Sequence, residues 1–337
     1  MTANHRARGT AALGFAISAA FLWWALRDVH VADVLDHLAG VRWPWFLASI
    51  AVATATFPLR TIRWRYLLRI EGVALPVGPL WHATAVGFMA NNVLPARAGE
   101  FARAYMARRL TGVRFTTAFA SIAVERILDG ITLVGMLLFA TAAGGFNPST
   151  RVGSVTLGSV ATGAAILFGA LLVVAVAVVR WPHPTLRLAE RVLHAMLPNR
   201  LAGRLHVLIG GLVEGLDALA APGRVAWALL WSSVVWATAA LSFWLAFRAF
   251  GIDVPWSAAA MLQALIAFGV AVPSAPGFAG VFEAVAKTTL VLYGVAETPA
   301  VSLAIGYHLG TWVPITALGF WSLARAGLRM GDLRGDA

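Results

Sequence analysis

The chain has 337 residues, of which 60% are hydrophobic and 12% are charged. Soluble domains average about 45–50% apolar and about 25% charged residues, so this composition excludes a soluble single-core protein and predicts a polytopic membrane protein. The net charge of +11 does not indicate nucleic acid, because the basic residues lie in short segments between apolar runs. The absence of cysteine excludes disulfides and thiolate-based metal sites.

Six apolar runs are long enough, or nearly so, to cross about 30 Å of hydrocarbon as helices. They cover Thr10–Leu26, Trp43–Leu59, Ile127–Ala143, Val152–Val179, Val225–Phe247 and Ala300–Leu323. No signal-peptide cleavage site follows the first run, so we expect it to be retained as a helix. These runs predict an all-α protein with six full spans and a single integral membrane domain over residues 1–337.

Two further apolar stretches, Pro76–Thr111 and Pro255–Tyr293, are interrupted halfway by proline and glycine. The residues expected to break the helices are Pro95, Gly99, Pro273, Pro276, Gly277 and Gly280. Proline and glycine disfavour a helix interior, so each stretch predicts a helical hairpin that is broken inside the membrane. The hairpins are re-entrant or consist of two full spans; both alternatives return the chain to its starting side.

The distribution of lysine and arginine predicts the orientation. The N-terminus, 60–71, 180–224 and the C-terminal tail hold 15 basic residues, whereas 27–42, 144–151 and 248–254 hold four. Cytoplasmic loops of membrane proteins carry the excess of basic residues. We therefore expect a prokaryotic cell (inner) membrane protein with both termini in the cytoplasm.

The connector 180–224 has a different pattern. Leucine and isoleucine residues between 205 and 219 share one helical face, and charged residues lie elsewhere. This pattern predicts a cytoplasmic amphipathic helix lying on the membrane surface, where six arginines favour an anionic leaflet. A solvated connector is the alternative.

The motif P-x-x-A-G-x-F occurs at 95–101 and again at 276–282, an offset of 181 residues. Repeat 1 (43–143) and repeat 2 (225–323) each consist of a span, a broken hairpin and a span. The charge distribution gives the two copies opposite orientations. Inverted-topology repeats with interrupted helices are typical of transporters, whose site lies near the midplane.

Polar residues stand at the expected membrane depth in both repeats, where they are costly and usually face protein or water. They are Asn91, Asn92, Arg97, Glu100, Arg103, Glu125, Arg126 and Asp129 in the first repeat, and Glu283, Lys287, Tyr307 and His308 in the second. Helical spacing lets Glu100 pair with Arg97 or Arg103, and lets Glu283 pair with Lys287. The alternative is structural: the asparagines cap the broken helix ends and the charges form ion pairs that stabilise the fold.

Four segments together are similar to one known family. They are RWR at 63–65 with Leu67 and Leu68, ANNVLPARAGEFARAY at 90–105, VERILD at 124–129 and PSAPGFAGVFEA at 273–284. Over residues 10 to 326 the chain resembles the flippase-like family, also described as the lysylphosphatidylglycerol synthase transmembrane domain, the membrane half of multiple peptide resistance factors. The resemblance implies roles for Asn92, Pro95, Arg97, Gly99, Glu100, Arg103, Glu125, Arg126, Pro276, Gly280 and Glu283. His308 departs from the family pattern, in which arginine is expected more often.

The resemblance implies movement of a lipid or lipid-linked headgroup between leaflets. We expect ATP-independent flipping of an anionic or polyprenyl-phosphate-linked lipid, because the chain has no P-loop motif. Arg97, Arg103 and Arg126 supply planar guanidinium groups that bind phosphate bidentately. We expect no enzymatic activity, no cofactor, no metal and no nucleic-acid partner. A homo-oligomer or a partner lipid-modifying enzyme is left open.

Two other functional classes are retained. One is a secondary transporter of a small anion with the same architecture. The other is a membrane glycosyltransferase that uses a polyprenyl-phosphate sugar and needs an acidic residue in an outside loop. Asp28, Asp33 and Asp36 lie in such a loop, but their spacing predicts an ordinary interfacial helix. Because the chain ends 14 residues after the last predicted span, we expect no soluble transferase half and no lysyl transfer.

Overall fold

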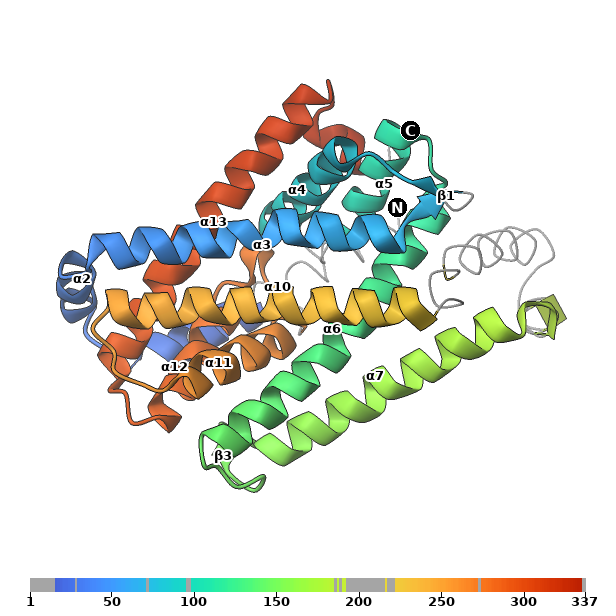
Figure 1. Ribbon diagram of the computed structural model, residues 1–337. Helices are drawn as coiled ribbons and strands as arrows, with labels where there is room; N and C mark the ends of the chain where they lie inside the picture. Colours follow the sequence, from blue (N-terminus) through green and yellow to red (C-terminus); the bar gives the residue numbers. More distant parts are fainter. Residues whose placement is uncertain are drawn as a thin grey trace.

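The computed structural model describes residues 16–27, 29–70, 73–94, 98–184, 187, 190–191, 216, 222–271 and 274–334. These residues form a mostly helical protein (Figure 1). The prediction of an all-α membrane protein fits this helical content, and two short antiparallel hairpins are the exceptions among the described residues. In them, β1 (Arg69–Ile70) pairs with β2 (Val73–Ala74), and β3 (Arg151–Val152) pairs with β4 (Val155–Thr156).

Four helices of the described residues are long and apolar enough to cross a membrane, so the prediction of a multi-pass membrane protein is confirmed. These helices are α3 (Trp43–Leu67), α7 (Leu157–Arg180), α10 (Pro222–Ala249) and α13 (Glu297–Arg325). The sequence pattern predicts six full spans, more than the four candidate spans among the described residues. The first run is described only over the short helix Ala16–Leu26. The third lies in α6 (Phe115–Ala143), which carries ionisable residues and buries about half of its length in the protein.

The long helices α3 and α10 lie side by side and antiparallel through the middle of the molecule (Figure 1). The start of α3 meets the end of α10, where the Arg42 N–H donates to the Ala249 carbonyl at 3.0 Å. Near the other end, Tyr66 of α3 packs edge-on against Trp227 of α10. This central pair packs against α6 and α13, and also against α4 (Val77–Val93) and α11 (Trp256–Gly269).

Each interrupted apolar stretch forms two α-helices, one on either side of the break. The first contains α4 (Val77–Val93) and α5 (Gly99–Thr111); the second contains α11 (Trp256–Gly269), the 3-10 helix η2 (Pro276–Phe278) and α12 (Val281–Leu292). Both stretches begin after a proline, at Pro76 and Pro255. Proline presets the backbone angle of a helix start and lacks a donor that would be unpaired there.

The second break is packed against the N-terminal helix. Gly277 and Gly280 have positive φ angles of 71° and 85°, which glycine adopts without a side-chain penalty. A Cβ atom on Gly280 would lie 2.2 Å from the Ser18 carbonyl oxygen, and the Ser18 hydroxyl accepts a hydrogen bond from the Ala275 N–H at 2.7 Å. The close approach of two backbones thus requires glycine at position 280.

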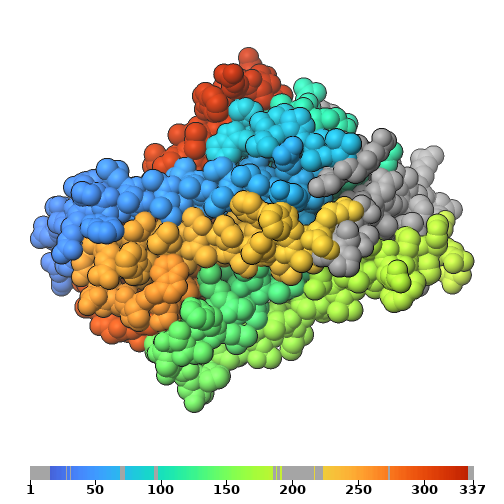
Figure 2. All heavy atoms as spheres, viewed as in Figure 1, coloured from blue at the N-terminus to red at the C-terminus, as the bar shows by residue number. Residues whose placement is uncertain are grey.

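The peripheral helices are α2 (Val31–Ala39) and α7. The segment 27–42 does contain a helix, α2. Helix α7 packs mainly against α6, buries only Leu157, Ala161 and Ala175, and follows the edge of the molecule (Figures 1 and 2). Most of the predicted connector 180–224 lies outside the described residues. The chain ends its described part in the 3-10 helix η3 (Met330–Arg334).

The charge distribution used for the orientation needs one correction. Arg60 and Arg63 do not lie in a loop, because α3 continues to Leu67, two turns beyond the predicted end at Leu59. Both side chains are buried. Without them the expected cytoplasmic segments hold 13 basic residues rather than 15, so the sign of the asymmetry is unchanged.

Candidate functional site

Six charged side chains gather between α3, α5 and α6. This charge cluster consists of Arg60, Arg63, Arg103, Glu125, Arg126 and Asp129. Glu125 and Asp129 are four residues apart on α6, which places both carboxylates on one helical face. Four guanidinium groups meet two carboxylates, so the cluster carries an excess of two positive charges.

Glu125 lies at the centre of the cluster and is fully buried. Its two carboxylate oxygens accept from the two terminal nitrogens of Arg103 at 2.9 and 3.1 Å, the bidentate geometry typical of this pair. Arg63 approaches the same carboxylate at 3.0 Å, and Arg126 also donates to it. Glu125 thus holds three arginines from three helices.

Asp129 connects the cluster to α10. Its carboxylate accepts from both terminal nitrogens of Arg63, one of them at 3.2 Å, and from the Trp236 indole N–H at 2.8 Å. Arg63 also donates to the Ser232 hydroxyl at 2.7 Å. Arg60 lies 3.9 Å from Asp129 and packs over the Trp236 ring. The packing of α3 on α10 therefore helps to fix the charges.

A cavity of about 600 Å³, here called the arginine cavity, opens beside the cluster. Its charged lining consists of Arg60, Glu100, Arg103, Arg126 and Asp129. The Arg126 side chain is 33% exposed, whereas Arg63 and Glu125 are 0% exposed. Other parts of the wall are aromatic, from Phe101, Phe119, Phe168 and Phe268. The cavity thus offers cationic and apolar surfaces to one ligand.

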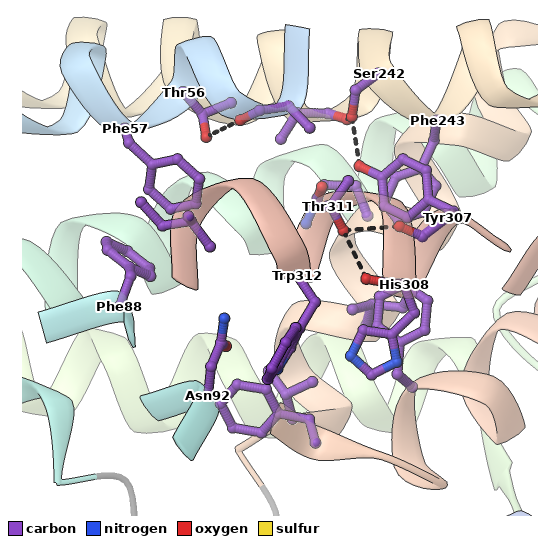
Figure 3. A pocket seen from close by; sticks show the side chains of 18 of the residues that line it. Thr56, Phe57, Phe88, Asn92, Ser242, Phe243, Tyr307, His308, Thr311 and Trp312 are labelled. Atoms are coloured by element: carbon purple, nitrogen blue, oxygen red, sulfur yellow. Dashed lines mark hydrogen bonds between the residues drawn. The ribbon is translucent and has the colours of Figure 1, made fainter. Parts of the chain in front are cut away.

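A second cavity of about 240 Å³, here called the aromatic cavity, lies among α3, α4, α10, α11 and α13. Figure 3 shows Trp312 between Asn92 and His308, with Phe57 and Phe88 on one side and Phe243 on the other. The two cavities are neighbours, because six residues line both. These residues are Arg60, Phe88, Asn92, Trp236, Val270 and Phe278.

His308 in the aromatic cavity is held through both ring nitrogens. Its Nδ1 lies 2.6 Å from the Glu283 carboxylate, and its Nε2 lies 2.8 Å from the Gly277 carbonyl oxygen. A carbonyl oxygen only accepts, so Nε2 carries a proton. The other Glu283 oxygen accepts from the Gly280 N–H at 2.6 Å. The histidine therefore fastens α13 to the second break.

The structure corrects the predicted pairing of Glu283 with Lys287. Glu283 contacts His308, while Lys287 forms an ion pair with Glu297 at 2.6 Å and donates to the Ala25 carbonyl oxygen at 3.2 Å. The i, i+4 spacing permitted the predicted pair, but helices α13 and the N-terminal helix offer closer partners. Lys287 lines neither cavity.

Tyr307 also lines the aromatic cavity. Its hydroxyl lies 2.5 Å from the Ser242 hydroxyl, and its ring stacks on Phe243 with centroids 4.1 Å apart. Tyr307 therefore joins α13 to α10, much as Asp129 joins α6 to α10.

The residues near the first break divide between structure and cavity. The Asn91 side-chain oxygen accepts from the Gly99 N–H at 2.8 Å, which closes the break. Asn92 donates to the Thr316 hydroxyl at 2.8 Å and lines both cavities. Glu100 lines the arginine cavity, but Arg103 pairs with Glu125 instead of Glu100. Pro95, Arg97 and Pro273 lie outside the described residues.

The sequence interpretation missed Arg60 and Arg63 as site residues, and also Trp236 from α10. Arg60 and Arg63 have i, i+3 spacing and directly follow an apolar run, and this spacing places two cations on one helical face. That signal was available, but both were assigned to a cytoplasmic loop. Among the described residues, no group of three or more His, Asp or Glu side chains is arranged to hold a metal ion.

Comparisons with known proteins agree with a membrane role. The sequence profile of a family described as "Lysylphosphatidylglycerol synthase TM region" matches residues 11–319. Glycosyltransferase AglD of Haloferax volcanii is 30% identical over 310 residues, which cover 83% of this chain and 48% of that protein. The chain thus spans about half the length of this curated relative.

Proposed function

The chain belongs to the lysylphosphatidylglycerol synthase transmembrane family, and from that premise we propose that it moves an anionic or polyprenyl-phosphate-linked lipid between leaflets without ATP. The observation that carries this proposal is the arginine cavity. Its neighbouring cluster has two more guanidinium groups than carboxylates, and Glu100, which lines the same cavity, offsets one of them. An uncompensated cation in a low-dielectric interior is costly, so an anionic ligand is favoured there.

Arg126 is the side chain best placed to contact the headgroup. It is the most exposed arginine of the cluster, and its Nη2 atom contacts both Glu125 and Asp129, which fixes the position of the guanidinium group. Arginine presents parallel N–H donors that match two phosphate oxygens. The nearby carboxylates limit the total charge of the empty cavity, which supports release of the substrate as well as binding.

A lipid substrate requires an opening from the arginine cavity toward the bilayer. We place this opening at the part of the cavity wall that α7 forms. Phe168 of α7 lines the arginine cavity and stacks on Phe268 at a centroid distance of 6.4 Å. The Phe168 ring also packs onto Gly130, where a Cβ would lie 2.3 Å away. Most of α7 is exposed on its outer side. Separation of Phe168 from Phe268 would connect the cavity to lipid.

The proposal includes two inverted repeats. The order α3, α4, α5, α6 is matched by α10, α11, α12, α13, and the paired helices have 25 and 28, 17 and 14, 13 and 12, and 29 and 29 residues. The antiparallel packing of α3 and α10 supports opposite orientations. Both cavities lie where the two sets of helices meet, as alternating access around a central site requires.

The orientation has its own test. We expect Asn147 on the outside and Asn199, like both termini, in the cytoplasm. Because the chain has no cysteine, single Asn147→Cys and Asn199→Cys variants can be labelled with an impermeant maleimide on intact cells. Labelling at position 147 alone is expected; labelling at position 199 alone would reverse the orientation.

Two alternatives remain defined by specific observations. A small-anion transporter would use the same arginines but would not need Phe168 and Phe268 to separate. A glycosyltransferase is favoured by the name of the Haloferax volcanii relative, although the matched region covers 48% of that protein. Release of a free sugar or polyprenyl phosphate by the purified protein would support the enzyme.

The test of lipid movement uses purified protein in liposomes. Labelled phosphatidylglycerol and labelled phosphatidylcholine are followed by leaflet-specific quenching without ATP. We expect the anionic lipid to move faster, and Arg126→Gln to remove that movement. Arg108→Gln is the matched control, because Arg108 is exposed near the end of α5. Uptake of a water-soluble anion with no lipid movement would contradict the proposal and favour the small-anion transporter.

A further inference from the structure

The aromatic cavity has a composition that phosphate binding does not explain. Aromatic rings from four elements face it: Phe57 of α3, Phe88 of α4, Phe243 of α10 and Trp312 of α13 (Figure 3). Flat apolar rings offer stacking surfaces, and a few polar groups among them fix the orientation of a ligand. Its volume of about 240 Å³ suits a compact ring rather than a long chain.

Gln263 of α11 is the polar group that lacks a partner. Its side chain lines the aromatic cavity and is only 8% exposed, yet it makes no hydrogen bond to any described residue. A glutamine amide offers two donors and one acceptor, and buried polar groups are normally hydrogen-bonded. A ligand with several hydroxyl groups would satisfy both the donors and the acceptor.

The charges around the cavity exclude a cationic ligand. Aromatic cages commonly bind quaternary ammonium or other cations, but no Asp or Glu is among the described residues that line this cavity. Arg60 and His308, in contrast, do line it. An isoprenoid or acyl chain fits the rings but leaves the Gln263 amide unpaired. A neutral, polyhydroxylated ring matches both the stacking surfaces and the amide.

The shared wall places the two cavities within reach of one headgroup. Arg60, Asn92 and Trp236 line both cavities, so the two cavities are adjacent and share a wall of side chains. A sugar attached directly to a phosphate has its ring only a few bonds from the phosphate oxygens. We therefore infer that one headgroup reaches both cavities, with its phosphate and its ring on either side of this wall.

We propose that the substrate is a lipid whose phosphate carries a neutral sugar, with the phosphate in the arginine cavity and the sugar against Gln263 and Trp312 in the aromatic cavity. This inference rests on the proposed function and names the substrate class. It also assigns Gln263 and Trp312 as residues that determine specificity. A soluble sugar phosphate shares the same headgroup chemistry and is distinguished by experiment.

The test compares three labelled lipids in liposomes: a short-chain polyprenyl-phosphoglucose, the same polyprenyl phosphate without sugar, and lysylphosphatidylglycerol. We expect the glucose-bearing lipid to move about tenfold faster than the sugar-free one, the effect of roughly one well-made hydrogen bond. Gln263→Met is expected to remove this preference, so that the sugar-bearing and sugar-free lipids move at similar rates.

Two controls separate specificity from stability. Methionine resembles glutamine in size and needs no hydrogen bond, so Gln263→Met should unfold at the same temperature as the wild type or higher. Ser257→Ala changes a buried residue of the same helix that lines neither cavity, and should alter neither rate. A fall in unfolding temperature with equal loss of both rates would assign Gln263 to the fold and overturn its role in specificity.

The remaining outcomes distinguish the inference from the proposed function. Equal movement of sugar-bearing and sugar-free phosphate lipids overturns the sugar site but leaves lipid flipping intact. Faster movement of lysylphosphatidylglycerol overturns the preference for a neutral group. Uptake of glucose 1-phosphate in place of any lipid assigns the cavities to a soluble sugar phosphate and overturns the lipid source. Lack of movement of every anionic lipid contradicts the proposed function itself.

Discussion

The two halves of the molecule use corresponding helices in different ways. In α6, Glu125 and Asp129 hold four arginines, whose charge does not change at physiological pH. In α13, the Tyr307 hydroxyl contacts the Ser242 hydroxyl and the His308 ring contacts the Glu283 carboxylate. The same region of the second half thus holds one histidine–carboxylate contact and several aromatic rings.

This difference indicates that the two halves are suited to different parts of one substrate. Permanent cations beside the larger cavity suit a phosphate, which keeps negative charge at all working pH values. The aromatic rings of the second half, with no Asp or Glu among the described residues that line the aromatic cavity, suit a neutral group. Each prediction below removes or strengthens one side of this contrast.

The largest effect is expected from Glu125→Gln. This substitution removes the carboxylate shared by Arg63, Arg103 and Arg126 and leaves buried cations without their partner. Breaking a buried ion pair from one side typically costs about 3–5 kcal/mol, so the variant should unfold far earlier in detergent or fail to accumulate. Glu297→Gln is the control, because that carboxylate is 43% exposed. Equal unfolding temperatures of both variants would refute a structural core at Glu125.

The second prediction concerns the α7 wall. Phe168→Cys and Phe268→Cys, joined by a short reducible bis-methanethiosulfonate cross-linker, should stop lipid movement, because the rings must separate to admit a lipid. Reduction should restore it. Each single cysteine variant with the same reagent is the control. Full lipid movement in the cross-linked protein would contradict a lipid pathway between these two rings. Blocked lipid movement with intact uptake of a water-soluble anion would show that the lipid, but not the anion, needs the rings to separate.

A smaller effect is expected from Arg126→Lys. Lysine keeps the positive charge but loses the planar pair of donors, so transport of an anionic lipid should fall about tenfold, by analogy with the loss of a hydrogen bond to a charged group. Initial rates from leaflet-specific quenching measure this change, with unfolding temperature as the control for folding. Unchanged transport would mean that charge alone, without bidentate geometry, suffices at Arg126.

The smallest effect is expected from His308→Arg. The substitution places a permanent cation beside Glu283, where the imidazole contacts that carboxylate and the Gly277 carbonyl oxygen. His308 lines the aromatic cavity but not the arginine cavity, so transport of an anionic lipid should change less than in Arg126→Lys. Initial rates of the two variants are compared. A larger loss in His308→Arg would contradict the assignment of the phosphate to the arginine cavity.

The sequence was sufficient for the local features of the fold. Hydropathy located the long helices, and proline with glycine located both interruptions, because these signals lie within a few residues of the structure that they determine. Helix ends were less certain. The span at Trp43 was expected to stop before Arg60, whereas α3 continues to Leu67 because its arginines meet carboxylates of α6.

The site depended on contacts between distant segments. Spacing brought Glu125 and Asp129 to one face of α6, but it did not reveal that α3 supplies two arginines to that face. The pairing of Glu283 failed for the same reason, since its partner His308 lies 25 residues away on α13. Gln263 could not be predicted as a site residue from the sequence, because a single glutamine in an apolar helix indicates a binding role only once the cavity that it lines is known.

The central claim, that the arginine cavity binds a lipid phosphate, is tested most directly by electron cryomicroscopy of the protein in nanodiscs that contain anionic lipid. The account predicts density for a headgroup phosphate within hydrogen-bond distance of Arg126, with its chains leaving between α7 and α11, and loss of that density in Arg126→Gln. An arginine cavity that holds only water, with every lipid phosphate at the membrane surface, would contradict it.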